Sequence, residues 1–201
     1  MSNAIDFYFD FSSPYGYFAA MRIDELAAKY GGTVKWHPVL LGVIFKSTGG
    51  APLPTLPLKG AYSLHDMERT ARFSGIAYRI PQTFPVSTQA AARAMLWVRN
   101  TSGDAKAIEF AKSMYQAYFV DNVNIDDANY VVRLASDFGQ NPAAMTEAIN
   151  STEIKEQLKD EVDRALKRGV FGSPYIIVDD EPFWGFDRFD QLEAFLKNGK
   201  I

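Results

Sequence analysis

The N-terminal segment changes from an alternating pattern to a helical one at a serine–proline step. Apolar residues alternate with more polar ones over residues 5–11, which is the period of a half-buried strand. Ser13 then precedes Pro14, a pair typical of a helix N-cap and the first helical position. Helical spacing continues to the glycines at 31–32, and a second strand is predicted over 33–39. The chain therefore opens with a β-α-β unit.

The middle of the chain combines a long glycine- and proline-rich segment with several helical patterns. Residues 42–60 are rich in glycine and proline and predict a long loop, of a kind that often covers a site. On the predicted helix that follows Gly103, one face carries Ile108, Ala111, Tyr115 and Tyr118, so we expect this face to pack in the core. Helical patterns occupy six segments, near 60–74, 87–100, 104–121, 127–138, 142–149 and 151–168.

The C-terminal part returns to mixed structure. It predicts a strand at 175–178, a turn, a short strand around 183–184 and a helix over 187–197. A β-α-β unit and a β-β-α unit separated by helices predict an α/β chain with a thioredoxin-like fold and an all-helical domain inserted between its halves. We expect the thioredoxin-like domain to comprise 1–39 and 169–201, and the helical insertion to comprise 40–168.

Composition excludes several classes of function. The 201 residues are 47% apolar, which is enough to bury a sizeable core. The net charge of −3 comes from 21 basic and 24 acidic residues without a basic stripe, so nucleic acid is not an expected partner. No apolar run reaches about 18 residues and the N-terminus lacks a signal-peptide pattern, so no membrane association and a cytoplasmic location are expected.

The chain contains no cysteine, so it forms no disulfide and has no cysteine nucleophile of its own. His37 and His65 are its two histidines, and closed zinc sites take about four nitrogen or sulfur ligands, so no metal site is expected. Any sulfur chemistry must therefore come from a bound thiol.

Three short segments carry residues suited to chemistry. Ser13 lies where the N–H groups of a helix start can stabilise an anion, although an N-cap serine is also an ordinary structural feature. The bond before Pro174 is open to either isomer, and a cis bond would present the backbone of Ser173 to a ligand. Asp187 either caps the last helix or accepts an amino group at the edge of a site, and these roles are compatible.

Long segments at both ends resemble a known family. FYFDFSSPYGY and GVFGSPYIIVDDEPFWGFDRFD strongly resemble the 2-hydroxychromene-2-carboxylate isomerases and the related kappa-class glutathione transferases. LLGVIFKSTGG, KGAYSLHDMERTARFSGI and the pair Phe84-Pro85 are similar to the same family in the same order, so the resemblance covers the whole chain. The family is related to periplasmic disulfide oxidoreductases, which have Cys-x-x-Cys where residues 13–16 here are Ser-Pro-Tyr-Gly.

This resemblance implies a cytoplasmic, dimeric enzyme with glutathione as cofactor. By similarity, the catalytic residue Ser13 donates a hydrogen bond to the glutathione sulfur. Ser173 pairs with the cysteinyl backbone ahead of a cis Pro174, and Asp187 holds the γ-glutamyl end. Lys59 is also expected at the glutathione site.

The chain departs from the family pattern at two places. Gly49-Gly50 stand where many relatives have an asparagine, and Phe186, at a glutathione-contacting position, replaces a residue that is often small and polar. We expect these departures to alter the affinity for glutathione.

The implied second ligand is a small aromatic substrate. The aromatic residues Tyr15, Tyr17, Phe45 and Trp184 are candidates for an apolar pocket, and Lys46, Lys59 and Arg72 are candidate partners for a substrate carboxylate.

Four functions remain compatible with these residues. In the isomerase, a thiolate adds reversibly to the substrate, whereas in a kappa-class-like transferase the thiolate stays attached. A non-catalytic thioredoxin-fold binding module is consistent with the absence of cysteine. A serine hydrolase pairing Ser13 with His37 or His65 is disfavoured, because no G-x-S-x-G sequence surrounds Ser13.

Overall fold

A four-stranded mixed sheet forms the centre of the computed structural model, which describes residues 4–201. The first three residues of the predicted thioredoxin-like domain lie outside this range. The strand order is β2-β1-β3-β4, with β1 parallel to β2 and both other pairs antiparallel. The predicted α/β thioredoxin-like class is therefore confirmed. The strands are β1 (Ala4–Phe9), β2 (Thr33–Pro38), β3 (Tyr175–Val178) and β4 (Glu181–Trp184).

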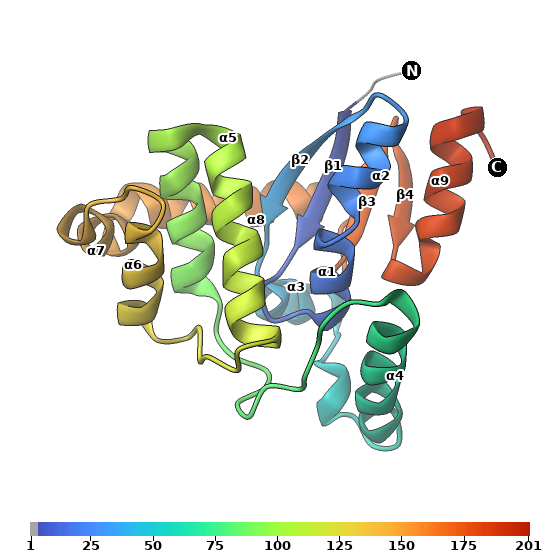
Figure 1. Ribbon diagram of the computed structural model, residues 1–201, viewed down its shortest axis with the longest axis horizontal. Helices are drawn as coiled ribbons and strands as arrows, with labels where there is room; N and C mark the ends of the chain where they lie inside the picture. The colour runs from blue at the N-terminus through green and yellow to red at the C-terminus, as the bar shows by residue number, and fades with distance from the viewer. Residues whose placement is uncertain (1–3) are drawn as a thin grey trace.

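Helices cover both faces and one end of this sheet (Figure 1). In the figure, the group formed by α5, α6 and α7 lies beyond β2, α9 lies beside β4, and α4 projects below the sheet. None of the helices within residues 4–201 is both long and apolar enough to cross a membrane. The helices are α1 (Pro14–Ala20), α2 (Ile23–Lys29), α3 (Leu41–Thr48), α4 (Lys59–Ser74), α5 (Gln89–Phe119), α6 (Ala128–Ser136), α7 (Pro142–Asn150), α8 (Thr152–Lys167) and α9 (Phe189–Asn198).

The two faces of β1 have different chemistry. Ile5, Phe7 and Phe9 are fully buried, and the Phe9 ring contacts Trp36 of β2 and Tyr115 of α5. The alternate residues Asp6 and Tyr8 have polar groups, and both accept hydrogen bonds from Arg168 at the end of α8. The predicted alternation of β1 therefore separates an apolar core from a polar contact layer. On α5, the predicted core face is confirmed, because Ala111, Tyr115 and Tyr118 are buried and Ile108 packs against them.

Helix α5 consists of two helical segments joined at Gly103, which has φ 84° and ψ 171°. Figure 1 shows these segments side by side, running in opposite directions. This agrees with the two helices predicted near 87–100 and 104–121. A positive φ suits glycine, so this residue makes the reversal possible without a longer loop.

Three local expectations were wrong. Residues 41–48 form α3 rather than part of a long loop, and the segment that follows contains a short 3-10 helix at Leu53–Thr55. The first predicted helix is divided into α1 and α2 at Met21-Arg22. Asp187 lies in a short 3-10 turn before α9 and does not cap that helix, whose N-cap position is Arg188.

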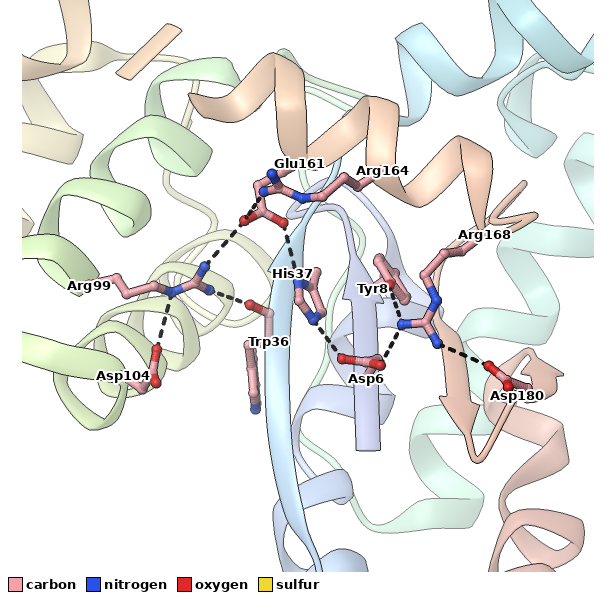
Figure 2. Close-up of polar contacts among 10 residues, drawn as sticks. All are labelled: Asp6, Tyr8, Trp36, His37, Arg99, Asp104, Glu161, Arg164, Arg168 and Asp180. Atoms are coloured by element: carbon pink, nitrogen blue, oxygen red, sulfur yellow. Dashed lines mark hydrogen bonds and ion pairs between the residues drawn. The ribbon is translucent and has the colours of Figure 1, made fainter. Parts of the chain in front are cut away.

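A chain of charged side chains joins α8 to the polar face of the sheet (Figure 2). His37 of β2 lies between two carboxylates, with Nε2 at 2.9 Å from Asp6 and Nδ1 at 3.2 Å from Glu161 of α8. A neutral imidazole has one N–H group, so both contacts are hydrogen bonds only when the ring is doubly protonated. Arg99 and Arg164 also approach Glu161, at 3.7 and 2.9 Å.

The cations around Glu161 set its ionisation. Burial alone would raise the pKa of this carboxyl, but the hydrogen bond from His37 and the charges of His37, Arg164 and Arg99 together lower the pKa. A carboxyl with a lowered pKa in the folded state stabilises the fold above the pKa of the unfolded chain, and this contribution is lost as the pH falls.

We predict that Glu161→Gln lowers the free energy of unfolding at pH 7 by roughly 2 kcal/mol, because it removes the buried carboxylate that pairs with the partly exposed His37, Arg99 and Arg164. The difference from the wild type should shrink as the pH falls below about 4.5, the ordinary pKa of a glutamate, because the unfolded wild-type chain then binds a proton that the folded carboxyl takes up only at lower pH. Urea denaturation at pH 7 and at pH 3.5 measures both effects. Glu156→Gln, an exposed site on the same helix, is the matched control. A difference that does not change with pH would contradict this account.

Candidate active site

A large cleft opens at the end of the sheet where β1 leads into α1. Its volume is about 1720 Å³, and its walls come from the start of α1, from α3 and α4, and from the segments that flank β3 and β4. The lining is largely apolar, with Leu41, Phe45, Phe84, Phe171 and Phe189 among its side chains. Ser13, Ser173, Pro174, Phe186 and Asp187, which are distant in sequence, all line this cleft.

Ser13 is the N-cap residue of α1, as the sequence predicts, and Pro14 follows at the first helical position. The Ser13 Oγ accepts a hydrogen bond from the Gly16 backbone N–H at 3.0 Å and donates one to the Ser173 carbonyl oxygen at 2.9 Å. The residue is only 5% exposed, although it lines the cleft. Its hydroxyl is therefore held in a defined orientation at the base of the cleft.

The segment before β3 forms the part of the wall that lies against Ser13. The Ser173–Pro174 peptide bond is cis. Trp184 packs on the backbone of Gly172, where an added Cβ would lie 2.3 Å from the indole nitrogen, so any larger residue would displace the indole. Phe171 contacts the edge of the same indole with ring centroids 4.8 Å apart. The two half-exposed rings form an aromatic surface next to Ser173.

Asp10 is the functional-site residue that the sequence analysis missed. Its side chain is buried, and the residue is only 4% exposed. The carboxylate accepts hydrogen bonds from the Ser12 N–H at 2.8 Å, the Leu41 N–H at 2.7 Å and the Thr88 hydroxyl at 3.0 Å. Burial raises the pKa of this carboxyl, and the three hydrogen bonds offset only part of that shift. Asp10 thus joins the loop that carries Ser13 to the starts of α3 and α5.

A second polar group lies on the α1–α4 side of the cleft. The Tyr15 hydroxyl donates to Asp66 of α4 at 2.6 Å, and Asp66 also pairs with Arg69. Burial and the neighbouring carboxylate raise the pKa of Tyr15, so the phenol stays protonated. Arg69 in turn donates to the Tyr62 hydroxyl at 3.0 Å. These contacts fix the position of Tyr15 in the cleft wall.

The remaining predicted site residues are divided between the cleft and other places. Lys46 and Phe45 of α3 line the cleft, as do Trp184 and Tyr15. Lys59 lies at the first position of α4 and Arg72 further along it, and neither lines this cleft. Tyr17 is buried below it, with its hydroxyl bonded to the Ala77 carbonyl at 2.7 Å.

Neither histidine is a hydrogen-bond partner of Ser13. His37 belongs to the charged chain of Figure 2, and His65 is exposed on α4. The hydroxyl of Ser13 is instead hydrogen-bonded to two backbone groups. A serine hydrolase needs a general base beside its nucleophile, and neither histidine takes this position. No group of three or more His, Asp or Glu side chains within residues 4–201 is arranged to hold a metal ion.

Comparison with known proteins agrees with this arrangement. The family model of the DsbA-like thioredoxin domain matches residues 4–197. The chain belongs to the DsbA-like thioredoxin family. Its relatives include 2-hydroxychromene-2-carboxylate isomerase from Sphingobium xenophagum, which is 31% identical over 98% of this chain and 99% of the relative.

One further relative and one solved structure are similar over nearly the whole chain. Glutathione S-transferase kappa 1 from Caenorhabditis elegans is 26% identical over 96% of this chain and 90% of the relative. A solved structure of 2-hydroxychromene-2-carboxylate isomerase superimposes with a TM-score of 0.86 at 26% identity, covering 96% of this chain and 94% of that chain. The resemblance found in the sequence is therefore confirmed at the level of the family.

We predict that Asp10→Asn destabilises the protein by about 1–3 kcal/mol, because the new amide group faces either the Leu41 N–H or the Ser12 N–H and leaves a buried donor unsatisfied. Urea denaturation measures the change. Asp160→Asn on the exposed face of α8 is the matched control and should be nearly neutral. Equal stability of the two variants would show that the Asp10 hydrogen bonds do not hold the three segments together.

Proposed function

We propose that this chain is a glutathione-dependent isomerase of 2-hydroxychromene-2-carboxylate or a similar aromatic compound, with Ser13 as its catalytic residue. One observation carries the proposal. A buried serine hydroxyl stands at the first turn of α1, at the base of an apolar cleft, in a chain that has no cysteine. Relatives named as isomerases and as kappa-class glutathione transferases support the choice of reaction class.

The polar groups of the cleft suit a γ-glutamyl peptide. Within residues 4–201, the Ser173 backbone N–H has no hydrogen-bond partner, which leaves it available to the cysteinyl carbonyl of glutathione. Asp187 also lines the cleft, and we assign it the γ-glutamyl amino group. Arg188 lies 3.3 Å from Asp187 and competes for the same carboxylate. Pro174 and Phe186 complete this wall, and Lys59 is proposed to approach glutathione from the start of α4.

The energetic requirement on Ser13 is modest. A free thiol has a pKa of about 8.5, and lowering it by about two units requires roughly 2.7 kcal/mol of preferential stabilisation of the anion. A hydrogen bond from a hydroxyl to an anion contributes about 1.5–3 kcal/mol, and a helix N-terminus contributes about 0.3–1 kcal/mol. Ser13 at the start of α1 combines both, acting as a donor and not as a base.

Glutathione held by Ser13, Ser173 and Asp187 would supply a thiolate for reversible addition to the substrate, and its later release would leave an isomerised product. Tyr15 and Trp184 would hold a flat substrate between them. Lys46 lines the cleft and forms no ion pair within residues 4–201, so its ammonium group is available to a substrate carboxylate.

A kappa-class-like transferase is the second candidate. Its early steps are the same, and the cleft of about 1720 Å³ leaves room for a bulky conjugate to form and depart. The third candidate, a non-catalytic binding module, would bind the same peptide without turnover.

We also propose that the chain acts as a homodimer. Leu58 and Phe73 on and beside α4 are each 93% exposed. Large apolar side chains that project this far from a folded chain favour an interaction surface. A second copy of the chain covering α4 would remove them from water, next to the mouth of the cleft.

The decisive test of the isomerase proposal is the ultraviolet thiolate absorbance of glutathione bound to the wild type and to Ser13→Ala across pH. We expect the wild type to lower the thiol pKa by about two units and the variant to restore it to near 8.5. Turnover of 2-hydroxychromene-2-carboxylate should fall in parallel. Thiolate formation without turnover would favour the transferase, binding without either would favour the module, and no binding of glutathione would refute the proposal.

The dimer is tested by light scattering coupled to size-exclusion chromatography. We expect twice the chain mass for the wild type and a monomer for the double variant Leu58→Asp/Phe73→Asp, because charges would then be buried at the interface. A monomeric wild type at micromolar concentration would exclude the dimer, and a dimeric double variant would move the interface away from α4.

A further inference from the structure

The proton of the Ser13 hydroxyl is already committed in the free protein. The Gly16 N–H points at Oγ from 3.0 Å, and the Ser173 carbonyl oxygen, which can only accept, lies 2.9 Å away. A serine hydroxyl has a single proton. That proton is therefore directed at Ser173 and away from any sulfur that enters the cleft.

Ser173 is itself held firmly against α1. Its Oγ accepts a hydrogen bond from the Asp10 backbone N–H at 3.1 Å. The same Oγ lies against Gly16, where an added Cβ would be 2.7 Å away. These contacts hold the Ser173 backbone in place, so the Ser13–Ser173 hydrogen bond is opened by turning the Ser13 hydroxyl and not by moving Ser173.

The proposed function makes two demands on this one contact. The Ser13 proton must point at the thiolate, and the Ser173 carbonyl must accept the cysteinyl N–H of glutathione. Both demands are met by a single exchange, in which the ligand N–H replaces the Ser13 hydroxyl at the carbonyl. The number of hydrogen bonds to the Ser173 carbonyl is then unchanged, and the serine proton is released.

We infer that the Ser13–Ser173 hydrogen bond is a self-paired lock that is opened by the backbone N–H of a peptidyl thiol. Ser173 is thereby a specificity-determining residue through its carbonyl group. A simple thiol has no N–H to offer this carbonyl, so it would have to break the lock without replacing it, and the site selects thiols carried on a peptide backbone. The inference rests on the proposed function and adds to it the class of thiol that activates the site.

The lock is tested with a ligand that has the backbone N–H but no thiol to accept the Ser13 proton. In γ-glutamyl-2-aminobutyryl-glycine a methyl group replaces the thiol of glutathione, while the backbone N–H remains. A carbonyl oxygen has two lone pairs and could accept both donors at once, so the analogue tests whether the N–H displaces the hydroxyl. If it does, binding to the wild type turns the Ser13 hydroxyl away from Ser173 with no thiolate to receive it. Ser13→Ala has no such bond to lose.

Isothermal titration calorimetry at pH 8 compares this analogue and glutathione on the wild type and on Ser13→Ala. We expect Ser13→Ala to bind the analogue roughly 2- to 12-fold more tightly, the equivalent of one net hydrogen bond. It should bind glutathione several-fold more weakly, because the thiolate loses its donor. A defect in the helix cap alone would weaken both ligands together, so the opposite signs separate the lock from a merely structural effect.

The matched control is Ser63→Ala on α4, a buried serine whose hydroxyl donates to the Gly60 carbonyl at 2.8 Å outside the cleft. Its ratio of the two affinities should equal that of the wild type. Circular dichroism establishes folding, and Ser13→Gly, which preserves more of the capping free energy, replaces Ser13→Ala if the latter does not fold.

An analogue affinity that is unchanged or weakened in the Ser13 variant overturns the lock. In that case the proposed function still stands if the wild type binds glutathione as the thiolate. If the wild type binds neither ligand, the proposed function fails, and the lock fails with it.

Discussion

The Asp10 carboxylate accepts hydrogen bonds from three segments that are far apart in the sequence and converge on this side chain. These segments are the loop before α1, the first residue of α3 and the residue before α5. The backbone of Asp10 extends the connection, since its N–H bonds to Ser173 and its carbonyl accepts the hydroxyl of Tyr115. Removing a carboxylate from water is unfavourable unless its lone pairs are satisfied, and here three donors satisfy them. The base of the cleft is therefore cross-linked through this one residue.

Local patterns were sufficient for most of the fold. The strand at 175–178 was predicted with the bounds that the structure has, because four consecutive apolar residues stand between a Gly-Ser-Pro and an Asp-Asp turn. Helix α3 was missed for a physical reason. It is short and has no side-chain cap, and its sequence contains glycine at 42 and is followed by glycine at 49. Its stability comes from tertiary contacts, including the burial of Ile44, which a local pattern does not contain.

The candidate site was predictable where it lies at the ends of strands and helices. Ser13 and Ser173 are 160 residues apart, yet each was marked by a neighbouring proline at the edge of a strand. Asp10 was not found, because as part of an alternating strand it has the place of a solvent-facing residue. Its position directly after the strand and three residues before Ser13 is the signal that could have revealed it. The distribution of the candidate cations depends on the course of α3 and α4, and the sequence did not define that course.

The close approach of Gly16 to its neighbours limits which side chains can stand three residues after Ser13. An added Cβ would meet the Ser173 Oγ at 2.7 Å and the Tyr115 hydroxyl at 2.9 Å. The Ser173 Oγ accepts the Asp10 N–H and the Tyr115 hydroxyl donates to the Asp10 carbonyl, so a larger residue at position 16 would have to displace groups that hold the base of the cleft. The packing that orients Ser13 therefore disfavours a second thiol of the kind that a Cys-x-x-Cys pair would place beside it.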